Sequence, residues 1–279
     1  MIASVLLGLV IGSFLNVVVY RLPIMMERAW RHECRVFLQL PEAGEERQEP
    51  FNLMVPDSHC PHCHHAVRAY ENIPVLSYLV LRGRCSECGQ RISIRYPMLE
   101  VFTALISVLT VWRFGVSMET VFALIFSWSL IALSMIDFDH QLLPDSITLP
   151  LLWLGLVLSL FGFFTDSHSS ILGVAAGYMS LWSVYHLFKL ATGKEGMGFG
   201  DFKLLAMLGA WMGWQMLPLI ILLSSVVGAI VGTLLAFFLK RGRNTPIPFG
   251  PYLAAAGWIA LLFGNDLTQL YLQYAGLSH

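Results

Sequence analysis

Charged residues are scarce in this chain. They make up 13% of its 279 residues, whereas hydrophobic residues make up 56%, and the mean hydropathy is +0.66. Soluble domains carry roughly 25% charged residues, so this composition excludes a soluble globular protein and indicates an integral membrane protein. The net charge of −1 offers no strongly basic surface, and we expect no nucleic-acid partner.

Two catalytic signatures are also missing. The sequence has no H-E-x-x-H stretch, which a membrane metalloprotease would need, and no G-x-S-x-G stretch, which a serine esterase would need. The first apolar run lacks the basic start and the A-x-A site of a cleaved signal peptide. We therefore expect this run to be retained as a membrane span.

Long apolar runs are abundant. A membrane helix needs about 20 apolar residues, and the sixth and seventh runs come from one stretch that Pro218 divides. We predict an all-α polytopic membrane protein with about eight transmembrane helices. The predicted parts are a first helix (1–20), a cytoplasmic zinc-binding loop domain (21–97) and a membrane bundle (98–279). The predicted spans are residues 2–20, 98–115, 119–136, 147–164, 171–190, 203–217, 218–239 and 250–264.

The positive charges are distributed unevenly along these runs. If the N-terminus is outside, sixteen of the 17 Lys and Arg residues lie inside, and Arg113 alone lies outside. Membrane proteins concentrate Lys and Arg in cytoplasmic loops. This orientation places the 21–97 loop, the stretch DFDHQLLPD (137–145) and the stretch GMGFGD (196–201) on the cytoplasmic face.

The loop at 21–97 carries four of the five cysteines. They form two C-x-x-C pairs, CPHC and CSEC, which are separated by 21 residues. Each pair turns two sulfurs toward one tetrahedral ion, so this spacing predicts a four-thiolate zinc site. The predicted ligands are Cys60, Cys63, Cys85 and Cys88.

Other interpretations of the cysteines stay open. A disulfide is disfavoured in a cytosolic loop, and a redox C-x-x-C pair would not need a second copy. A histidine near the first pair could replace one thiolate. Cys34 has no partner in the sequence, and we expect it to be a small buried residue.

Carboxylates at the ends of apolar runs are candidates for a functional site, because an acid at membrane depth is costly. Asp137 ends the third run, and Asp139 must point to a different side if that helix continues. We interpret Asp145 as an N-cap or first-turn residue and Glu100 as an acid that can snorkel. Asp201 alone could be only the N-cap of the sixth helix.

Glycines precede Asp201 at alternate positions. They allow the backbone to approach a ligand closely, but no strand or βαβ unit supports a phosphate loop here. We interpret Gly198 and Gly200 as a place where an extended peptide can lie beside a carboxylate.

Two aspartates on separate helices form the machinery of an aspartic protease. Two such groups in a partly dry site share one proton. The ionised carboxylate takes a proton from water while the protonated one polarises the scissile carbonyl. The alternative is a transporter with an aspartate relay, but a transporter would not need the cysteine loop, and its acids would be expected nearer the midplane.

The sequence resembles a known family in several ordered stretches. GSFLNVVVYRLP (12–23), the paired CPHC and CSEC, ENIPVLSYLVLRGRC (71–85), DFDHQLLPD and GMGFGDFKLL (196–205) are similar to the bacterial type IV prepilin peptidases. The resemblance covers nearly the whole chain. Members of this family are leader peptidases and N-methyltransferases of type IV pilus and type II secretion systems.

This resemblance implies specific roles. The G-x-G-D motif of the family falls on residues 198–201, and its partner aspartate matches Asp137. The implied substrates are prepilins and pseudopilins, cleaved at the cytoplasmic face of the bacterial inner membrane and methylated with S-adenosylmethionine. Methyl transfer needs no acid pair, so we expect its site to draw on the loop, where Gly83 could admit the donor. Gly83 could equally be a turn glycine.

Overall fold

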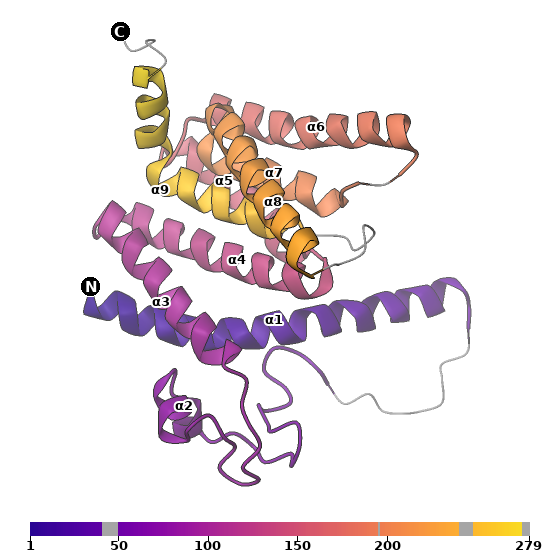
Figure 1. Cartoon of the computed structure of the whole chain (residues 1–279), viewed down its shortest axis with the longest axis vertical. Helices are drawn as coiled ribbons and strands as arrows, with labels where there is room; N and C mark the ends of the chain where they lie inside the picture. Colours follow the sequence, from indigo (N-terminus) through magenta and orange to yellow (C-terminus); the bar gives the residue numbers. More distant parts are fainter. Residues whose placement is uncertain (41–49, 195, 240–247, 275–279) are drawn as a thin grey trace. The chain divides into compact units, whose positions relative to one another are not determined.

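The computed structural model describes residues 1–40, 50–194, 196–239 and 248–274 (Figure 1). Within these ranges the chain is helical and has two isolated β-bridges but no β-strand. Each of the eight predicted apolar runs corresponds to one long helix. These helices are α1 (Ile2–Phe37), α3 (Arg95–Phe114), α4 (Met118–His140), α5 (Asp145–Leu160), α6 (Ser167–Thr192), α7 (Phe199–Met212), α8 (Leu217–Leu239) and α9 (Gly250–Tyr274).

The short elements are α2 (Leu76–Val80) and two 3₁₀ turns, η1 (Ala69–Asn72) and η2 (Trp214–Met216). Five described segments are long and apolar enough to cross a membrane, and α5 is a shorter apolar helix. The prediction of an all-α polytopic membrane protein is confirmed. The predicted loop residues 41–49 and the cations at 240, 241 and 243 lie outside the described ranges.

The chain forms two compact units, Met1–Thr120 and Val121–His279. In the first unit, α1 packs against α3 through glycines. A Cβ atom at Gly8 would lie 2.5 Å from the Cα of Ala104, and one at Gly12 would lie 2.6 Å from the Cα of Glu100. These distances are too short for any side chain, so the two backbones are in direct contact.

Helix α1 continues beyond the predicted span 2–20 and reaches Phe37. Arg21 is buried where the apolar run ends, and its guanidinium donates to the carbonyl oxygen of Asn52 at 3.0 Å and to that of Pro56. This contact ties the segment after α1 back to the helix. Cys34 lies on the extension and is exposed, so the prediction that it is buried is wrong.

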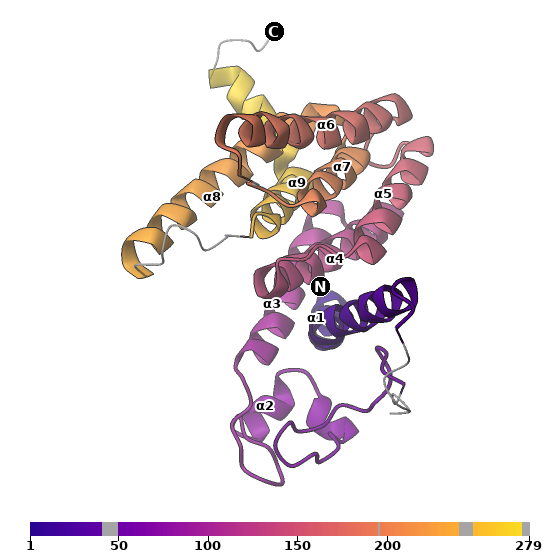
Figure 2. The ribbon, with the colours of Figure 1, turned by 90° about the vertical axis from the view of Figure 1, so that its right-hand side faces the viewer.

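In the second unit, α7 is the central helix and packs against α5, α6 and α9 (Figure 2). Every residue of α7 from Leu204 to Met212 is buried. Gly173 of α6 and Gly209 of α7 face each other so closely that a Cβ on either would meet the other backbone within 2.3 Å. Because α7 is enclosed by other helices, it does not need to be long enough to span the bilayer.

Candidate active site and metal centre

Asp201 lies in the first turn of α7 and is buried, with 6% of its surface exposed. Gly198 is the N-cap residue, so Asp201 occupies the third position of the helix and is not the cap itself. The backbone of Gly198 hydrogen bonds to the Asp201 carboxyl group. This is the half of a capping box in which a side chain reaches back to the residue that opens the helix.

Asp137 lies near the end of α4 and is equally buried, with 6% exposed. The backbone N–H of Gly250, the first residue of α9, donates to its Oδ2 at 3.0 Å. Each aspartate is therefore held by the backbone of a glycine at the start of a helix, Gly198 at the start of α7 for Asp201 and Gly250 at the start of α9 for Asp137. Asp139, two residues further on, is exposed, as its predicted direction requires.

Several observations bring the two aspartates into one site. Leu143, in the segment after α4, lies 2.9 Å from the position that a Cβ of Gly200 would occupy and 3.2 Å from the corresponding position at Gly250. The starts of α7 and α9 thus meet on one side chain. Asp137 also acts on Asp201 through a repulsive Coulombic interaction, so the two carboxyl groups are within electrostatic range.

The two glycines of the motif have different surroundings. A Cβ at Gly200 would collide with Leu143, so this glycine permits close packing. Gly198 is exposed, and the nearest atom to a Cβ placed there is Oδ2 of Asp201 at 3.9 Å. The space at Gly198 is open and lies directly beside the carboxylate.

Gly250 was not among the site residues predicted from the sequence. The available signal was the stretch PFGP at 248–251, in which a glycine between prolines opens an apolar helix. Asp145 is the first residue of α5, as expected, and its carboxylate binds Lys203 Nζ at 2.7 Å. Glu100 is buried and accepts a hydrogen bond from the backbone N–H of Val75 at 2.7 Å, so the prediction that it snorkels is wrong.

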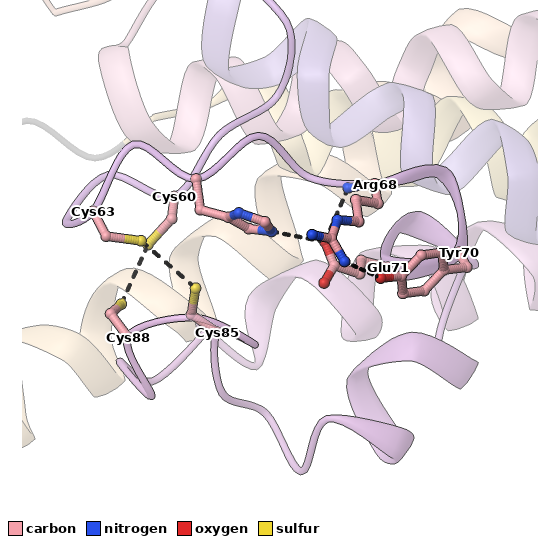
Figure 3. Close-up of polar contacts among 8 residues, drawn as sticks. Cys60, Cys63, Arg68, Tyr70, Glu71, Cys85 and Cys88 are labelled. Atoms are coloured by element: carbon pink, nitrogen blue, oxygen red, sulfur yellow. Dashed lines mark hydrogen bonds and ion pairs between the residues drawn. The ribbon is translucent and has the colours of Figure 1, made fainter.

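The four predicted metal ligands converge in the first unit (Figure 3). Their sulfur atoms all lie within 4.8 Å of one another. The Cys60–Cys88 and Cys63–Cys85 pairs are 3.8 and 3.9 Å apart. Sulfurs bound to one tetrahedral zinc ion lie about 3.8 Å apart, given a bond length of about 2.3 Å, so these residues fit a zinc ion.

The two cysteine pairs sit in equivalent backbone turns. Cys60 N–H donates to His65 O, and Cys85 N–H donates to Gln90 O. Residues 58–67 and 83–92 repeat the same three backbone hydrogen bonds with an offset of 25 residues, and the isolated bridges His59–Ala66 and Arg84–Arg91 follow the same offset. This structural repeat was not visible in the sequence because few side chains match between the two turns.

Backbone N–H groups hydrogen bond to the sulfurs of Cys60, Cys63 and Cys85, and these contacts favour the thiolate form. The N–H groups of Cys63 and His62 lower the pKa of Cys60 to about 6. Although the N–H of His65 favours its thiolate, desolvation and the neighbouring thiols raise the pKa of Cys63 to about 12. A dication would remove this conflict, because it stabilises all four thiolates at once.

Glu71 joins the two turns outside the sulfur cluster. Its pKa is lowered to about 2, first by the Ser86 hydroxyl and then by the N–H of Arg68. The Nε2 atom of His65 also lies 3.2 Å from the Glu71 carboxylate. Because Ser86 lies between Cys85 and Cys88, Glu71 connects both metal-binding turns.

Gly83 precedes the second turn and has φ +65°. A Cβ there would lie 2.8 Å from the ring of Tyr78. The space beside Gly83 is therefore filled by an aromatic ring, and the left-handed backbone gives the glycine a structural reason to be there.

Comparison with known proteins agrees with this architecture. Residues 6–114 match the bacterial peptidase A24 N-terminal domain, and residues 124–233 match the type IV leader peptidase family. Asp137 and Asp201 fall inside the second match, and Gly250 falls outside it. No solved structure matches the chain.

Several relatives carry the name prepilin leader peptidase/N-methyltransferase. The protein from Stutzerimonas stutzeri is 58% identical, and that from Pseudomonas aeruginosa is 56% identical; each alignment covers 99% of this chain and 95% of the relative. The protein from Aeromonas hydrophila is 55% identical, with 96% of this chain and 92% of the relative covered. Since these similarities extend over nearly the full length, the chain belongs to the type IV leader peptidase family.

Proposed function

We propose that this chain is a membrane aspartic endopeptidase that removes the leader peptides of prepilins and pseudopilins and then N-methylates the new N-terminal residue. The observation that carries this proposal is the pair of buried carboxyl groups, Asp137 and Asp201, on separate helices and within electrostatic range. The names of the relatives supply the substrate class and the second activity.

The hydrogen bonds limit where the shared proton can lie. The Gly250 N–H is a donor, so Oδ2 of Asp137 must accept, and a proton on Asp137 must be on Oδ1. In the hydrolytic step, the ionised carboxylate takes a proton from the attacking water while the protonated one donates to the scissile carbonyl. The carboxyl group that took the proton from water then gives it to the amide nitrogen as the C–N bond breaks. The other aspartate recovers its proton from the hydroxyl group of the intermediate, so the pair again holds one shared proton.

The open space at Gly198 gives the substrate a route to the acids. An extended leader segment could lie along the backbone before α7 with no side chain between it and Asp201. The close contact between Gly200 and Leu143 stabilises this route, because it holds the start of α7 against the segment after α4.

The proposal can be tested with the purified chain in lipid nanodiscs. Incubation with a full-length prepilin should shorten the substrate by its leader, as measured by intact mass. Addition of S-adenosylmethionine should add 14 Da, the mass of one methylene group, to the new N-terminus. Absence of cleavage with every prepilin and pseudopilin supplied would favour the transporter alternative, which requires solute flux across proteoliposomes.

We also propose that the metal is zinc and that its role is structural. Four thiolates fill a tetrahedral ion and leave no position for a catalytic water. The chain is proposed to lie in the bacterial inner membrane with the cysteine turns and both aspartates on the cytoplasmic face. The distribution of sixteen of 17 positive charges supports this orientation.

Zinc content should depend on the four cysteines. Wild type should contain about one equivalent per chain, and Cys60→Ser or Cys88→Ser should lower it to near zero, because metal binding and folding of the two turns are coupled. Elemental analysis after purification without chelators measures this. Cys34→Ser is the control and should keep its zinc, since Cys34 is exposed and outside the cluster. Metal-free wild-type protein would contradict the prediction.

A substitution at Gly83 should separate methyl transfer from leader cleavage. The unprotonated amine of the new N-terminus would attack the methyl carbon of S-adenosylmethionine, the bond between this carbon and the sulfonium sulfur would break to release S-adenosylhomocysteine, and the methylated amine would lose one proton to water. Gly83→Val should push Tyr78 away and reduce methyl transfer to a pre-cleaved pilin, while leader cleavage stays near the wild-type rate. Labelled S-adenosylmethionine and intact mass measure the two activities separately.

Gly89→Val is the matched control for this experiment. Gly89 follows Cys88 in the second turn and also has a left-handed backbone, with φ +71°, but a Cβ there would meet nothing within 4 Å. The Gly89→Val substitution therefore introduces backbone strain comparable to that of Gly83→Val, but it does not displace an aromatic ring. Equal loss of methyl transfer in both variants would assign the effect to distortion of the metal-binding turns and would refute a specific role for the Gly83 region.

A further inference from the structure

Helix α2 is a short apolar element between the two cysteine turns. Three of its five side chains are large, apolar and exposed: Leu76 (56%), Leu79 (64%) and Val80 (74%). Such a cluster in the polar segment of a membrane protein indicates contact with something outside the first unit. The position of α2 along the membrane helices α1 and α3 indicates that its apolar side chains contact lipid.

The N-terminus of α2 is fixed beside α3. Val75, its N-cap residue, donates its backbone N–H to Oε2 of Glu100 at 2.7 Å. Glu100 is five residues after the start of α3 at Arg95, which corresponds to about 7.5 Å along the helix axis. Val75 is therefore held within the reach of one glutamate side chain from a residue that lies inside the helix.

Helix α1 provides a second measure of depth. The Cα of Glu100 lies against Gly12, and Gly12 is eight residues, or about 12 Å, from the end of the apolar run at Tyr20. The hydrocarbon core is about 30 Å thick. Both measures place the Cα of Glu100, whose side chain holds the start of α2, inside the membrane spans of α1 and α3.

The backbone of this segment is suited to such a depth, where each unsatisfied N–H would be costly. Val75 donates to a carboxylate, and Pro74 has no N–H. Backbone carbonyls accept from residues 76, 77, 79, 81, 82 and 83. The segment satisfies these donors within the protein and does not require water for them.

The residues after α2 have the opposite character. Arg82 and Arg84 are both exposed. Cations adjacent to an inserted apolar segment extend toward the lipid phosphates. The apolar helix α2 therefore corresponds to the acyl-chain region of one leaflet, and the two arginines that follow it correspond to the headgroup region.

We propose that α2 is inserted into the bilayer leaflet on the side of the cysteine turns, with Leu76, Leu79 and Val80 in contact with phospholipid acyl chains. Arg82 and Arg84 lie at the phosphate level and mark the point where the chain returns to water. The metal-binding turns are thereby anchored to the membrane surface at a point additional to α1 and α3.

The full chain in vesicles of phosphatidylcholine and phosphatidylglycerol can test this insertion. An environment-sensitive fluorescent amino acid is incorporated by codon suppression at position 79, and in a second protein at position 80. Position 87, which is exposed between Cys85 and Cys88, serves as the aqueous control. Quenching is measured with phosphatidylcholine brominated on its acyl chains and with iodide in the buffer.

We expect brominated lipid to quench positions 79 and 80 several-fold more strongly than position 87, and iodide to show the reverse order. Iodide quenching at 79 and 80 equal to that at 87 would overturn the proposal, because α2 would then lie in water. Failure of both quenchers at 79 and 80 would also overturn it, because protein and not lipid would then cover the helix. Retained leader cleavage by each labelled chain checks that it is folded.

Discussion

Asp201→Asn and Asp137→Asn should each reduce leader cleavage by at least about a thousandfold, the scale expected for losing a group that transfers protons in the transition state. Asparagine keeps the size of the side chain and can still accept a hydrogen bond from a glycine N–H. It cannot take a proton from water or share one with the other aspartate. Single-turnover cleavage of a prepilin, followed by intact mass, measures the loss.

Asp139→Asn is the internal control for both variants. Asp139 is on the same helix as Asp137 but exposed, so its replacement should leave cleavage near the wild-type rate. Each protein must also elute as a single species and unfold at a similar temperature. Near-normal cleavage by either buried variant would refute the aspartyl mechanism, and loss with Asp139→Asn alone would move the first carboxylate by two residues.

The sequence predicted the number and type of the long helices because apolar runs are a strong local signal. It failed at the end of α1. Charged residues after Tyr20 suggested a loop, but α1 continues to Phe37, and the buried Arg21 is satisfied by carbonyls more than 30 residues away. No local pattern can reveal a contact of that range.

The candidate site was also predictable only where its residues stand out in the local sequence. Asp137 and Asp201 could be selected because each interrupts the apolar character of a predicted span, and the cysteine spacing identified its own cluster. Gly250 contributes only its backbone N–H to Asp137, and a backbone contact has no residue-type signature. The different roles of Gly198 and Gly200 likewise depend on Leu143, which approaches one of them and not the other.

Gly250 has no side chain, but its backbone N–H holds the carboxylate of Asp137, which we propose to be catalytic. A Cβ at this position would lie 2.6 Å from Oδ2 and 3.1 Å from Cγ of Asp137. Gly250→Ala should therefore turn the carboxylate away and remove its hydrogen bond to the N–H. A displacement of about 1 Å in a catalytic group can cost about a hundredfold in rate, so we expect kcat to fall by about this factor while KM for the prepilin changes little.

Gly257→Ala separates this effect from general crowding in the helix bundle. Gly257 lies on the same helix, two turns further on, and a Cβ there would be just as crowded, 2.5 Å from a methyl carbon of Leu208. Both variants should lose stability from overpacking, but only Gly250→Ala places the new atom against the carboxylate of Asp137. Equal losses of kcat in the two variants, or a loss in Gly250→Ala that follows its melting temperature, would show that α9 contributes packing and does not position Asp137.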